Sequence, residues 1–367
     1  LESMLQRVRF QNKEQVPFVK TLRKRVNTYF KENNISRNAN AKMVIKTISV
    51  FLIYLVPYAL VYSGLITGIY GFILAILMGF GMAGIGMCVM HDANHGAYSS
   101  KPQVNDFLGI CIYLIGGDVY NWKVQHNIFH HTYTNIDGLD CDLHQDPYLR
   151  LSSEQKWNRI HKFQHIYAFF LYALGTLLWS VIDFVQHRRF TKLGMSPEGK
   201  LDKGKQFRKL LFYKMAYWSF IFVLPIIFSP FSWWQIVLGW LVMNMVAGFI
   251  LTVTFQLAHV VEGVYFPAPS EEGKMENEWM IHQLKTTANF AKNSKLITWF
   301  VGGLNFQIEH HLFPNICHIH YEKISDIVRA TVEEYGMVYN YNKTYLGAVY
   351  SHYKMLKALG VQPILVK

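Results

Sequence analysis

The 367-residue chain has few cysteines and few carboxylates, and each shortage excludes something. Its four cysteines lack the paired spacing of a zinc site, so we expect free thiols in a reducing compartment. The 24 Asp and Glu residues are outnumbered by 36 Lys and Arg, and the net charge of +12 favours anionic partners: phospholipid head groups, a phosphorylated substrate carrier or an acidic protein. The basic N-terminus lacks an early apolar core, so we expect no cleavable signal peptide. No internal repeat or Gly/Ser linker is visible.

Apolar residues are abundant and are bunched into long runs. Hydrophobic residues make up 51% of the chain and aromatic residues 16%. Long runs predict membrane spans, and they argue against nucleic-acid binding, which the charge alone would suit. About 20 helical residues cross a hydrocarbon core of ~30 Å. Four runs therefore predict two transmembrane hairpins: 47–66 with 69–90, and 212–229 with 233–258.

Two further apolar runs are not counted as spans: 107–117 is expected to be re-entrant or interfacial, and 166–182 is expected to be interfacial. The run 107–117 is too short to cross, and 166–182 is the shortest remaining candidate. An even number of crossings must separate the histidine clusters described below if they share one site, which excludes 166–182 as a span. The turns 67–68 and 229–232 carry no Lys or Arg, so the positive-inside tendency places every histidine cluster on the cytoplasmic face.

These expectations define an all-α integral membrane protein with four transmembrane helices and a cytoplasmic helical cap that holds a metal site. The predicted divisions are a basic cytoplasmic N-terminal segment with a solvated amphipathic helix (1–46), transmembrane hairpin 1 (47–90), cap residues with the first two histidine clusters (91–211), transmembrane hairpin 2 (212–258), and cap residues with the third cluster (259–367).

Seven of the sixteen histidines fall in three short clusters. The clusters read HDANH (91–95), HNIFHH (126–131) and QIEHH (307–311). Residues four apart share one helix face, so His91 pairs with His95 and His126 pairs with His130. A nitrogen-rich, thiolate-poor cluster is typical of iron, copper or zinc chemistry rather than of a small structural zinc site. The predicted ligands are His91, His95, His126, His130, His131, His310 and His311, with His259 added because it ends an apolar run at the same predicted depth.

Other polar residues near the clusters receive supporting assignments. Asp92, Glu309, Asp140 and Asp142 are candidates for holding the second nitrogen of a ligand imidazole, with a solvated surface as the alternative for Asp140 and Asp142. Gln307 is either a ligand or an indirect contact. The remaining histidines are expected to be packing residues, although His318 and His320 could orient ligands or contact a head group: His144, His161, His165, His187, His282, His318, His320 and His352.

The three clusters resemble the histidine boxes of the membrane-bound fatty acid desaturase superfamily, over about residues 45–325. The resemblance implies four membrane helices, a cytoplasmic cap and two non-haem irons, with O2 as co-substrate and His259 as an additional ligand. Gln307 at the start of the third box is similar to the front-end members, which desaturate between an existing double bond and the carboxyl end. The His-Pro-Gly-Gly haem motif is absent, so the resemblance implies an external electron donor: a b-type cytochrome, or ferredoxin with its reductase. It therefore also favours a stand-alone member in a bacterial inner membrane over one in the endoplasmic reticulum.

The resemblance also implies a fatty acyl-CoA or phospholipid substrate in a bent apolar tunnel. Trp122, Trp299 and Phe306 are candidates for lining it, with ordinary packing as the alternative. Lys123, Arg188 and Arg189 are candidates for holding a phosphorylated head group. Two other functions stay open: a lipid hydroxylase or ketolase with the same two irons, and a non-enzymatic membrane metal transporter or sensor. Transporters usually bind their ions near the bilayer midplane, which argues against the last.

Overall fold

The computed structural model describes residues 8–10, 15–143, 147–197, 199 and 201–361. His144 and Asp146 lie outside these described residues. The chain divides into two units. The spanning unit comprises residues 39–124 and 169–253, and the histidine unit comprises the described residues of 1–38, 125–168 and 254–367.

The four predicted membrane helices are confirmed. Among the described residues, four stretches are long and apolar enough to cross a bilayer: Ala41–Leu60, Gly68–Asn94, Lys203–Phe228 and Trp233–His259. Their helices are α3 (Ala41–Leu60), η2 (Gly68–Tyr70), α4 (Gly71–Gly84), η3 (Ile85–Met90), α5 (His91–Asn94), α12 (Lys203–Trp218), η6 (Ser219–Val223), α13 (Leu224–Phe228) and α14 (Trp233–His259). The first and third begin earlier than the apolar runs because Asn40 and Asp202 cap polar first turns.

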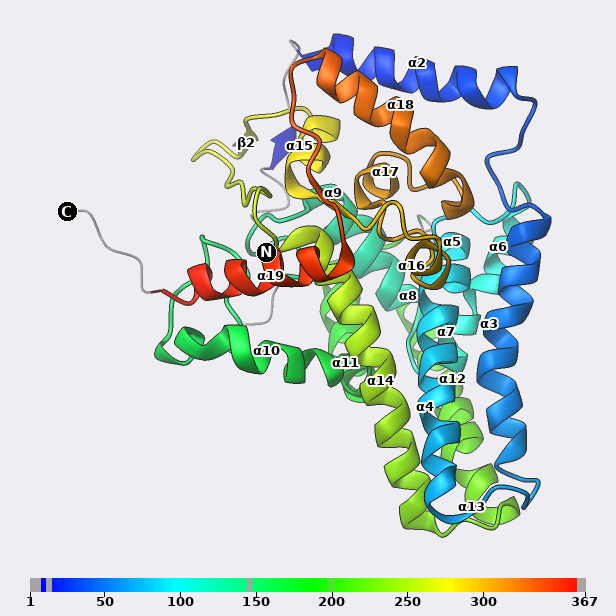
Figure 1. Ribbon diagram of the computed structural model, residues 1–367. Coiled ribbons are helices and arrows are strands. Elements are labelled where there is room, and N and C mark those ends of the chain that lie inside the picture. The colour runs from blue at the N-terminus through cyan, green and yellow to red at the C-terminus, as the bar shows by residue number, and fades with distance from the viewer. Residues whose placement is uncertain (1–7, 11–14, 144–146, 198, 200, 362–367) are drawn as a thin grey trace. The chain divides into compact units, whose positions relative to one another are not determined.

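Shorter helices connect the spans, as Figure 1 shows. They are α6 (Pro102–Gly109), α7 (Cys111–Leu114), α8 (Val119–Trp122), η5 (Arg159–Phe163), α10 (Gln164–Ala173) and α11 (Gly175–Lys192). The run 107–117 is divided between α6 and α7. The run 166–182 is divided between α10 and α11, and the helical stretches on the two sides of this break meet at 75°. Such a bend fits a re-entrant pair or a broken span, so the interfacial placement of 166–182 stays a prediction.

Glycine allows α4 to approach its neighbours closely. A Cβ on Gly81 would lie 2.5 Å from the backbone nitrogen of Tyr54 on α3. A Cβ on Gly79 would lie 2.7 Å from the carbonyl oxygen of Met243 on α14. Both distances are too short for any side chain, so helix packing inside the spanning unit requires glycine here.

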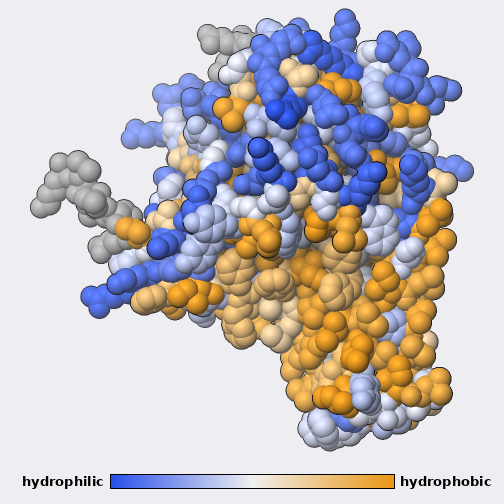
Figure 2. Space-filling model, viewed as in Figure 1, coloured by the Kyte–Doolittle hydropathy of each residue, from blue (hydrophilic) through white to orange (hydrophobic). Residues whose placement is uncertain are grey.

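The outer surface of the spanning unit is apolar. Ile48, Leu52 and Val56 on α3 are 55%, 53% and 48% exposed, and Phe228 on α13 is 65% exposed. Figure 2 shows apolar surface over α3, α4, α13 and α14. Exposed aliphatic side chains in such number suit a hydrocarbon surrounding, because in water they would form a large apolar patch.

A buried polar network joins three helices of the spanning unit. The ammonium group of Lys214 on α12 donates to Asp183 Oδ2 at 2.5 Å, to the Trp179 carbonyl at 2.7 Å and to the Gly116 carbonyl at 2.5 Å. The Asn121 amide donates to the Asp183 side chain and carbonyl. The network therefore ties α11 and α12 to α8, which directly precedes η4 (Lys123–His130) along the chain.

The histidine unit is built mainly from short helices. Its elements are β1 (Arg9–Phe10), α2 (Val16–Glu32), α9 (His131–Tyr133), β2 (Lys274–Met275), α15 (Trp279–Thr286), β3 (Asn289–Phe290), α16 (Lys295–Phe300), α17 (Gln307–Leu312), η7 (His318–His320), α18 (Tyr321–Glu334), β4 (Tyr341–Asn342) and α19 (Tyr345–Leu359). Strand β1 pairs in parallel with β2, and β3 with β4.

The N-terminal helix is amphipathic but not fully solvated, which corrects the prediction for this segment. Helix α2 lies beside α18 (Figure 1). Its side chains Phe18, Leu22 and Val26 are buried in one apolar cluster with residues of α18 and of α17. Aromatic and aliphatic side chains at helical spacing drive this packing. In the sequence, the many Lys and Arg residues on the other face of the helix made this apolar face hard to recognise.

We expect Lys214→Met to destabilise the spanning unit, because it leaves the buried Asp183 carboxylate without its cation. Removal of one partner from a buried ion pair costs about 3 kcal/mol or more. Thermal unfolding in detergent measures the effect, and Lys209→Met on the exposed face of the same helix is the control. Equal unfolding temperatures for the two variants would show that the pair does not stabilise the fold.

We expect Asp118 to make stability fall as pH rises. Burial raises the pKa of Asp118 to about 7, although its carboxylate accepts a hydrogen bond from the Asn121 backbone N–H. Between about pH 4 and pH 7 the folded protein therefore binds a proton that the unfolded chain releases. Asp118→Asn keeps the helix cap and removes this titration. Across this range the unfolding temperature of Asp118→Asn should depend less on pH than that of the parent. The exposed control Asp106→Asn should keep the pH dependence of the parent.

Candidate metal centre

The second histidine cluster lies on a π-helix rather than on the expected α-helix. The π-helix η4 runs through His130, and His131 begins α9. The rings of His126 and His130 stack with centroids 5.2 Å apart, so the two still share a face. Inserted π-helical turns are frequent at functional sites because they redirect side chains. A second π-helix, η3, leads directly to His91.

The carboxylate of Asp140 contacts the Nδ1 atom of the His130 ring. Its carboxylate oxygens lie 3.0 and 3.1 Å from His130 Nδ1, and both groups are buried. The same carboxylate accepts backbone N–H groups of Asn135 and Asp142 at 2.9 and 3.0 Å. Asn135, at φ 60°, turns the chain so that the loop returns to the helix that it left. Asp142 lies 3.4 Å from His126 Nδ1. The alternative of a solvated surface does not describe Asp140.

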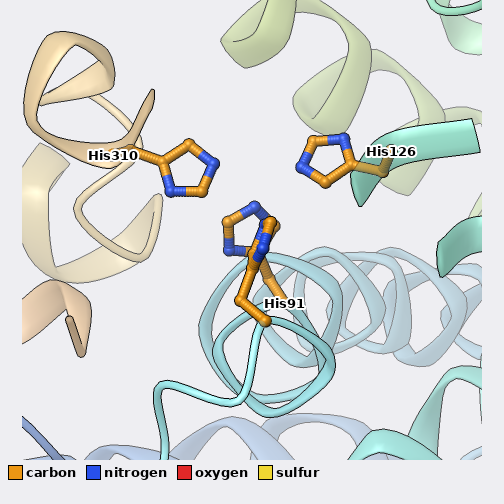
Figure 3. Close-up of side chains that lie close together, drawn as sticks. His91, His126 and His310 are labelled. Carbon is orange, nitrogen blue, oxygen red and sulfur yellow. The ribbon is translucent and has the colours of Figure 1, made fainter. Parts of the chain in front are cut away.

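The third cluster is fixed by partners outside the motif. On α17, His310 Nδ1 lies 3.1 Å from the Tyr321 hydroxyl, and His311 Nδ1 lies 2.7 Å from Gln283 Oε1. Figure 3 shows the rings of His310 and His126 turned toward one another, with centroids 6.1 Å apart. Neither Tyr321 nor Gln283 carries a sequence signal, because neither belongs to a histidine box and each is one polar residue among the others of its helix.

His259, at the end of α14, joins these imidazoles. Its Nδ1 lies 3.3 Å from the Thr286 carbonyl. Its ring centroid lies 4.7 Å from that of His130 and 4.9 Å from that of His311. One ring nitrogen from each of these three histidines lies within 4.8 Å of the other two. His131, His310 and His311 form a second such group, and His126, His130 and Asp142 a third.

The central triad of His130, His259 and His311 fits a metal ion. Each ring has a partner at Nδ1: Asp140, the Thr286 carbonyl and Gln283. Within the part of the chain that the structure describes, none of their Nε2 atoms has a hydrogen-bond partner, although all three rings are buried. A buried polar atom without a hydrogen-bond partner destabilises the fold. Neutral imidazole nitrogens are common metal ligands, so a bound metal ion would satisfy these atoms. The all-nitrogen donor set suits iron, copper or zinc.

The charges of the site prepare it for a cation. Burial holds the pKa of His311 well below its usual range, and neighbouring imidazoles lower it further. His311 is therefore neutral near pH 7 and available as a ligand. Burial also lowers the pKa of His130, but the charge and the hydrogen bond of Asp140 outweigh it, so the net direction is upward. A carboxylate behind an imidazole makes its other nitrogen a stronger metal ligand.

The first cluster belongs to the spanning unit. The rings of His91 and His95 lie with centroids 4.7 Å apart. Trp122, a candidate for lining a tunnel, contacts both rings edge to face at 5.7 and 5.5 Å. Asp92 is buried, and its Oδ1 lies 3.8 Å from His91 Nδ1. The i, i+4 pairing predicted for this cluster is therefore present.

The other predicted residues occupy several different surroundings. Glu309 directs its carboxylate to Asn289 Nδ2 at 2.7 Å and to the Tyr339 hydroxyl at 2.8 Å, and burial raises its pKa to about 7. Gln307 is buried at the first position of α17. Phe306 is buried in the apolar cluster that includes α2, whereas Trp299 is 39% exposed.

The histidines that were expected to be packing residues, and that lie among the described residues, are buried or partly buried. Buried His282 contacts the Thr134 carbonyl through Nε2 at 2.8 Å, and burial lowers its pKa to about 4. Buried His352 contacts the Val260 carbonyl at 2.6 Å. His161 completes a capping box with Asn158 at the start of η5. His165, His187, His318 and His320 lie at packed or partly buried positions.

Comparison with known proteins gives a consistent result. Residues 67–343 match the fatty acid desaturase family. A sn-1 linoleoyl-lipid 6-desaturase of Arthrospira platensis is 36% identical over 95% of this chain and 94% of its own length. A protein of the same description from Synechocystis is 34% identical over 97% of this chain and 98% of its own length. An acyl-lipid (8-3)-desaturase of Physcomitrium patens is 33% identical over 95% of this chain and 72% of its own length.

We expect Asp140→Asn to weaken metal binding, because the neutral amide no longer supports His130 as a carboxylate does. Loss of such an outer partner typically costs 10–100-fold in metal affinity. Metal retained per chain against a graded chelator series measures the effect. The control is Asp137→Asn, a partly exposed carboxylate in the same loop. If both variants retain metal as the parent does, Asp140 has no influence on the centre.

Proposed function

The chain belongs to the fatty acid desaturase family, and from this premise we propose that it forms a cis double bond in the acyl chain of a membrane lipid. Membership makes the chain an oxidoreductase of that family. The observation that carries the proposal is the buried triad His130, His259 and His311, whose Nε2 atoms are available together. Desaturation of an unactivated methylene pair needs a metal centre of this kind, because no side chain alone removes such hydrogens.

We propose that eight histidines hold two non-haem irons, about four for each. Six lie in the histidine unit: His126, His130, His131, His259, His310 and His311. The box pattern and the family support His91 and His95 as the other two. When bound, the irons would supply the activation of dioxygen. The balanced reaction takes one O2, two electrons from a donor, two protons and two substrate hydrogens, and gives the alkene and two waters.

The protein's own part is to hold the ligands and to position the substrate. Asp140, Gln283 and Tyr321 keep three Nδ1 atoms occupied. An acyl chain offers no polar handle near the reacting carbons, so selectivity must come from the shape of an apolar channel. Trp122, which contacts His91 and His95, and buried Phe306, next to Gln307, remain our candidates for shaping it.

Relatives and motif together support a lipid-bound substrate and a front-end position. Two of the named relatives are linoleoyl-lipid 6-desaturases and a third is an acyl-lipid (8-3)-desaturase. Gln307 at the start of the third box is the residue that front-end members carry. We propose that a linoleoyl lipid gains its new double bond between the carboxyl carbon and the existing double bonds. A separate b-type cytochrome or ferredoxin would supply electrons.

The cytoplasmic face is proposed for the metal centre. Four apolar helices make the chain an integral membrane protein. The turn at 229–232 carries no cation, whereas exposed Arg188, Arg189 and Lys203 lie on the segment that joins the two hairpins in sequence. Anionic lipid head groups and the positive-inside tendency both favour the cytoplasmic side for such a segment.

Expression in a host of defined lipid composition tests the proposal. Linoleate is supplied, lipid and thioester pools are separated, and new double bonds are located by mass spectrometry. We expect a triene in the lipid pool, dependent on about two irons per chain. An alcohol in place of the alkene would identify a hydroxylase. Zinc or copper with no new product would identify a metal transporter or sensor instead.

His130→Ala is the matched inactive variant. It removes a central ligand, so we expect a membrane-inserted protein that lost its metal and forms no product. His352→Ala is the control, because His352 is equally buried in the histidine unit, contacts the Val260 carbonyl and belongs to none of the possible metal-binding groups of the described residues. Retained desaturation in His130→Ala would remove this histidine from the ligand set.

A further inference from the structure

Helix α15 is the buried element that contacts all the ligand-bearing segments of the histidine unit. Trp279 Nε1 and Gln283 Nε2 both donate to the His131 carbonyl at 3.1 Å. His282 contacts the Thr134 carbonyl, and the Thr286 carbonyl faces His259. Helix α15 has eight residues, and the five consecutive residues from Met280 to Leu284 are all buried. No histidine box includes this helix.

We propose that Gln283 is a positioning residue that sets the tautomer of His311 and thereby directs its Nε2 to the metals. Its side-chain amide lies between two boxes: Nε2 contacts the His131 carbonyl, and Oε1 contacts His311 Nδ1 at 2.7 Å. The inference deepens the proposed function and rests on the metal centre named there.

The orientation of this amide is fixed by its surroundings. A backbone carbonyl can only accept a hydrogen bond, so the end of the amide that faces the His131 carbonyl must be the NH2 group. The other end, facing His311, is then the carbonyl oxygen. The Thr134 hydroxyl lies 2.8 Å from the same oxygen and can donate to it. A flipped amide would place two acceptor oxygens 3.1 Å apart at His131, without a proton between them.

The tautomer follows from the amide. Because Gln283 Oε1 is an acceptor, His311 Nδ1 must carry the proton, and Nε2 keeps its lone pair. His311 belongs to two of the possible metal-binding groups, one with His130 and His259 and one with His131 and His310. A protonated Nε2 would remove a ligand from each. The backbone of the second box therefore determines, through one glutamine, which nitrogen of the third box can bind metal.

The test compares three variants in the full-length protein in detergent. Gln283→Met has a similar size and neither hydrogen bond. Gln283→Glu keeps an acceptor oxygen that faces His311 Nδ1. Gln164→Met is the matched control: Gln164 is also fully buried in the histidine unit, and it bonds Arg150 and the Leu356 carbonyl instead.

Iron retained against a chelator series, the visible spectrum of the cobalt(II)-substituted protein, and thermal unfolding are measured together. We expect Gln283→Met to lose 10–100-fold in metal affinity with an altered cobalt spectrum. We expect Gln283→Glu to recover most of the affinity, and Gln164→Met to lower the unfolding temperature without changing either metal signal. Parental metal binding in Gln283→Met, or equal metal loss in Gln164→Met, would overturn the positioning role.

A measurement on the parent chain keeps the inference testable if Gln283→Met does not fold. Nitrogen-15 NMR of the zinc-loaded protein, with His311 assigned by a His311→Gln variant, should show a protonated Nδ1. A protonated Nε2 would refute the proposal. A parent chain that contains no iron and forms no alkene would instead refute the proposed function, while the zinc-loaded spectrum would still report the tautomer.

Discussion

The structure depends on burying several imidazoles together while keeping one nitrogen of each available. In water, both ring nitrogens would find partners, but here the rings are removed from solvent and their nitrogens are divided between two tasks. The Nδ1 atoms of His130, His259 and His311 meet a carboxylate, a backbone carbonyl and an amide oxygen. The Nε2 atoms are left to a cation, whose binding compensates for their desolvation.

The three partners differ in charge, and this difference has chemical consequences. Asp140 is a buried carboxylate at His130 Nδ1, so it makes His130 a strong electron donor. Gln283 and the Thr286 carbonyl are neutral, so they orient His311 and His259 without adding charge. A site of neutral imidazoles alone would leave bound cations poorly compensated in a buried setting. Asp140 and Asp142 therefore place carboxylates beside the rings of His130 and His126.

The sequence predicted which histidines lie close together better than it predicted their hydrogen-bond partners. Histidine spacing predicted that His126 and His130 share a face, and apolar runs predicted four spans. The three histidine boxes predicted a family that the comparisons confirm. Sequence reasoning missed Gln283 and Tyr321, because a single polar residue on a buried helix has the same pattern as ordinary packing. It was also wrong about the solvation of α2, whose cations concealed its apolar face. Outer partners arise from tertiary contacts between distant segments, which spacing cannot encode.

The third box shows why motif residues need not all be ligands. In α17, Glu309 faces away from the imidazoles and bonds Asn289 and Tyr339, while the Ile308 backbone N–H donates to Asn289 Oδ1. Asn289 lies on β3, which pairs with β4, so these contacts fasten the start of the helix to a fixed strand pair. Six residues make α17 too short to be stable alone. Glu309, which lies between Gln307 and the two histidines in the sequence, therefore anchors this helix through Asn289 and Tyr339. Its anchoring adds to the contacts that Tyr321 and Gln283 make with His310 and His311.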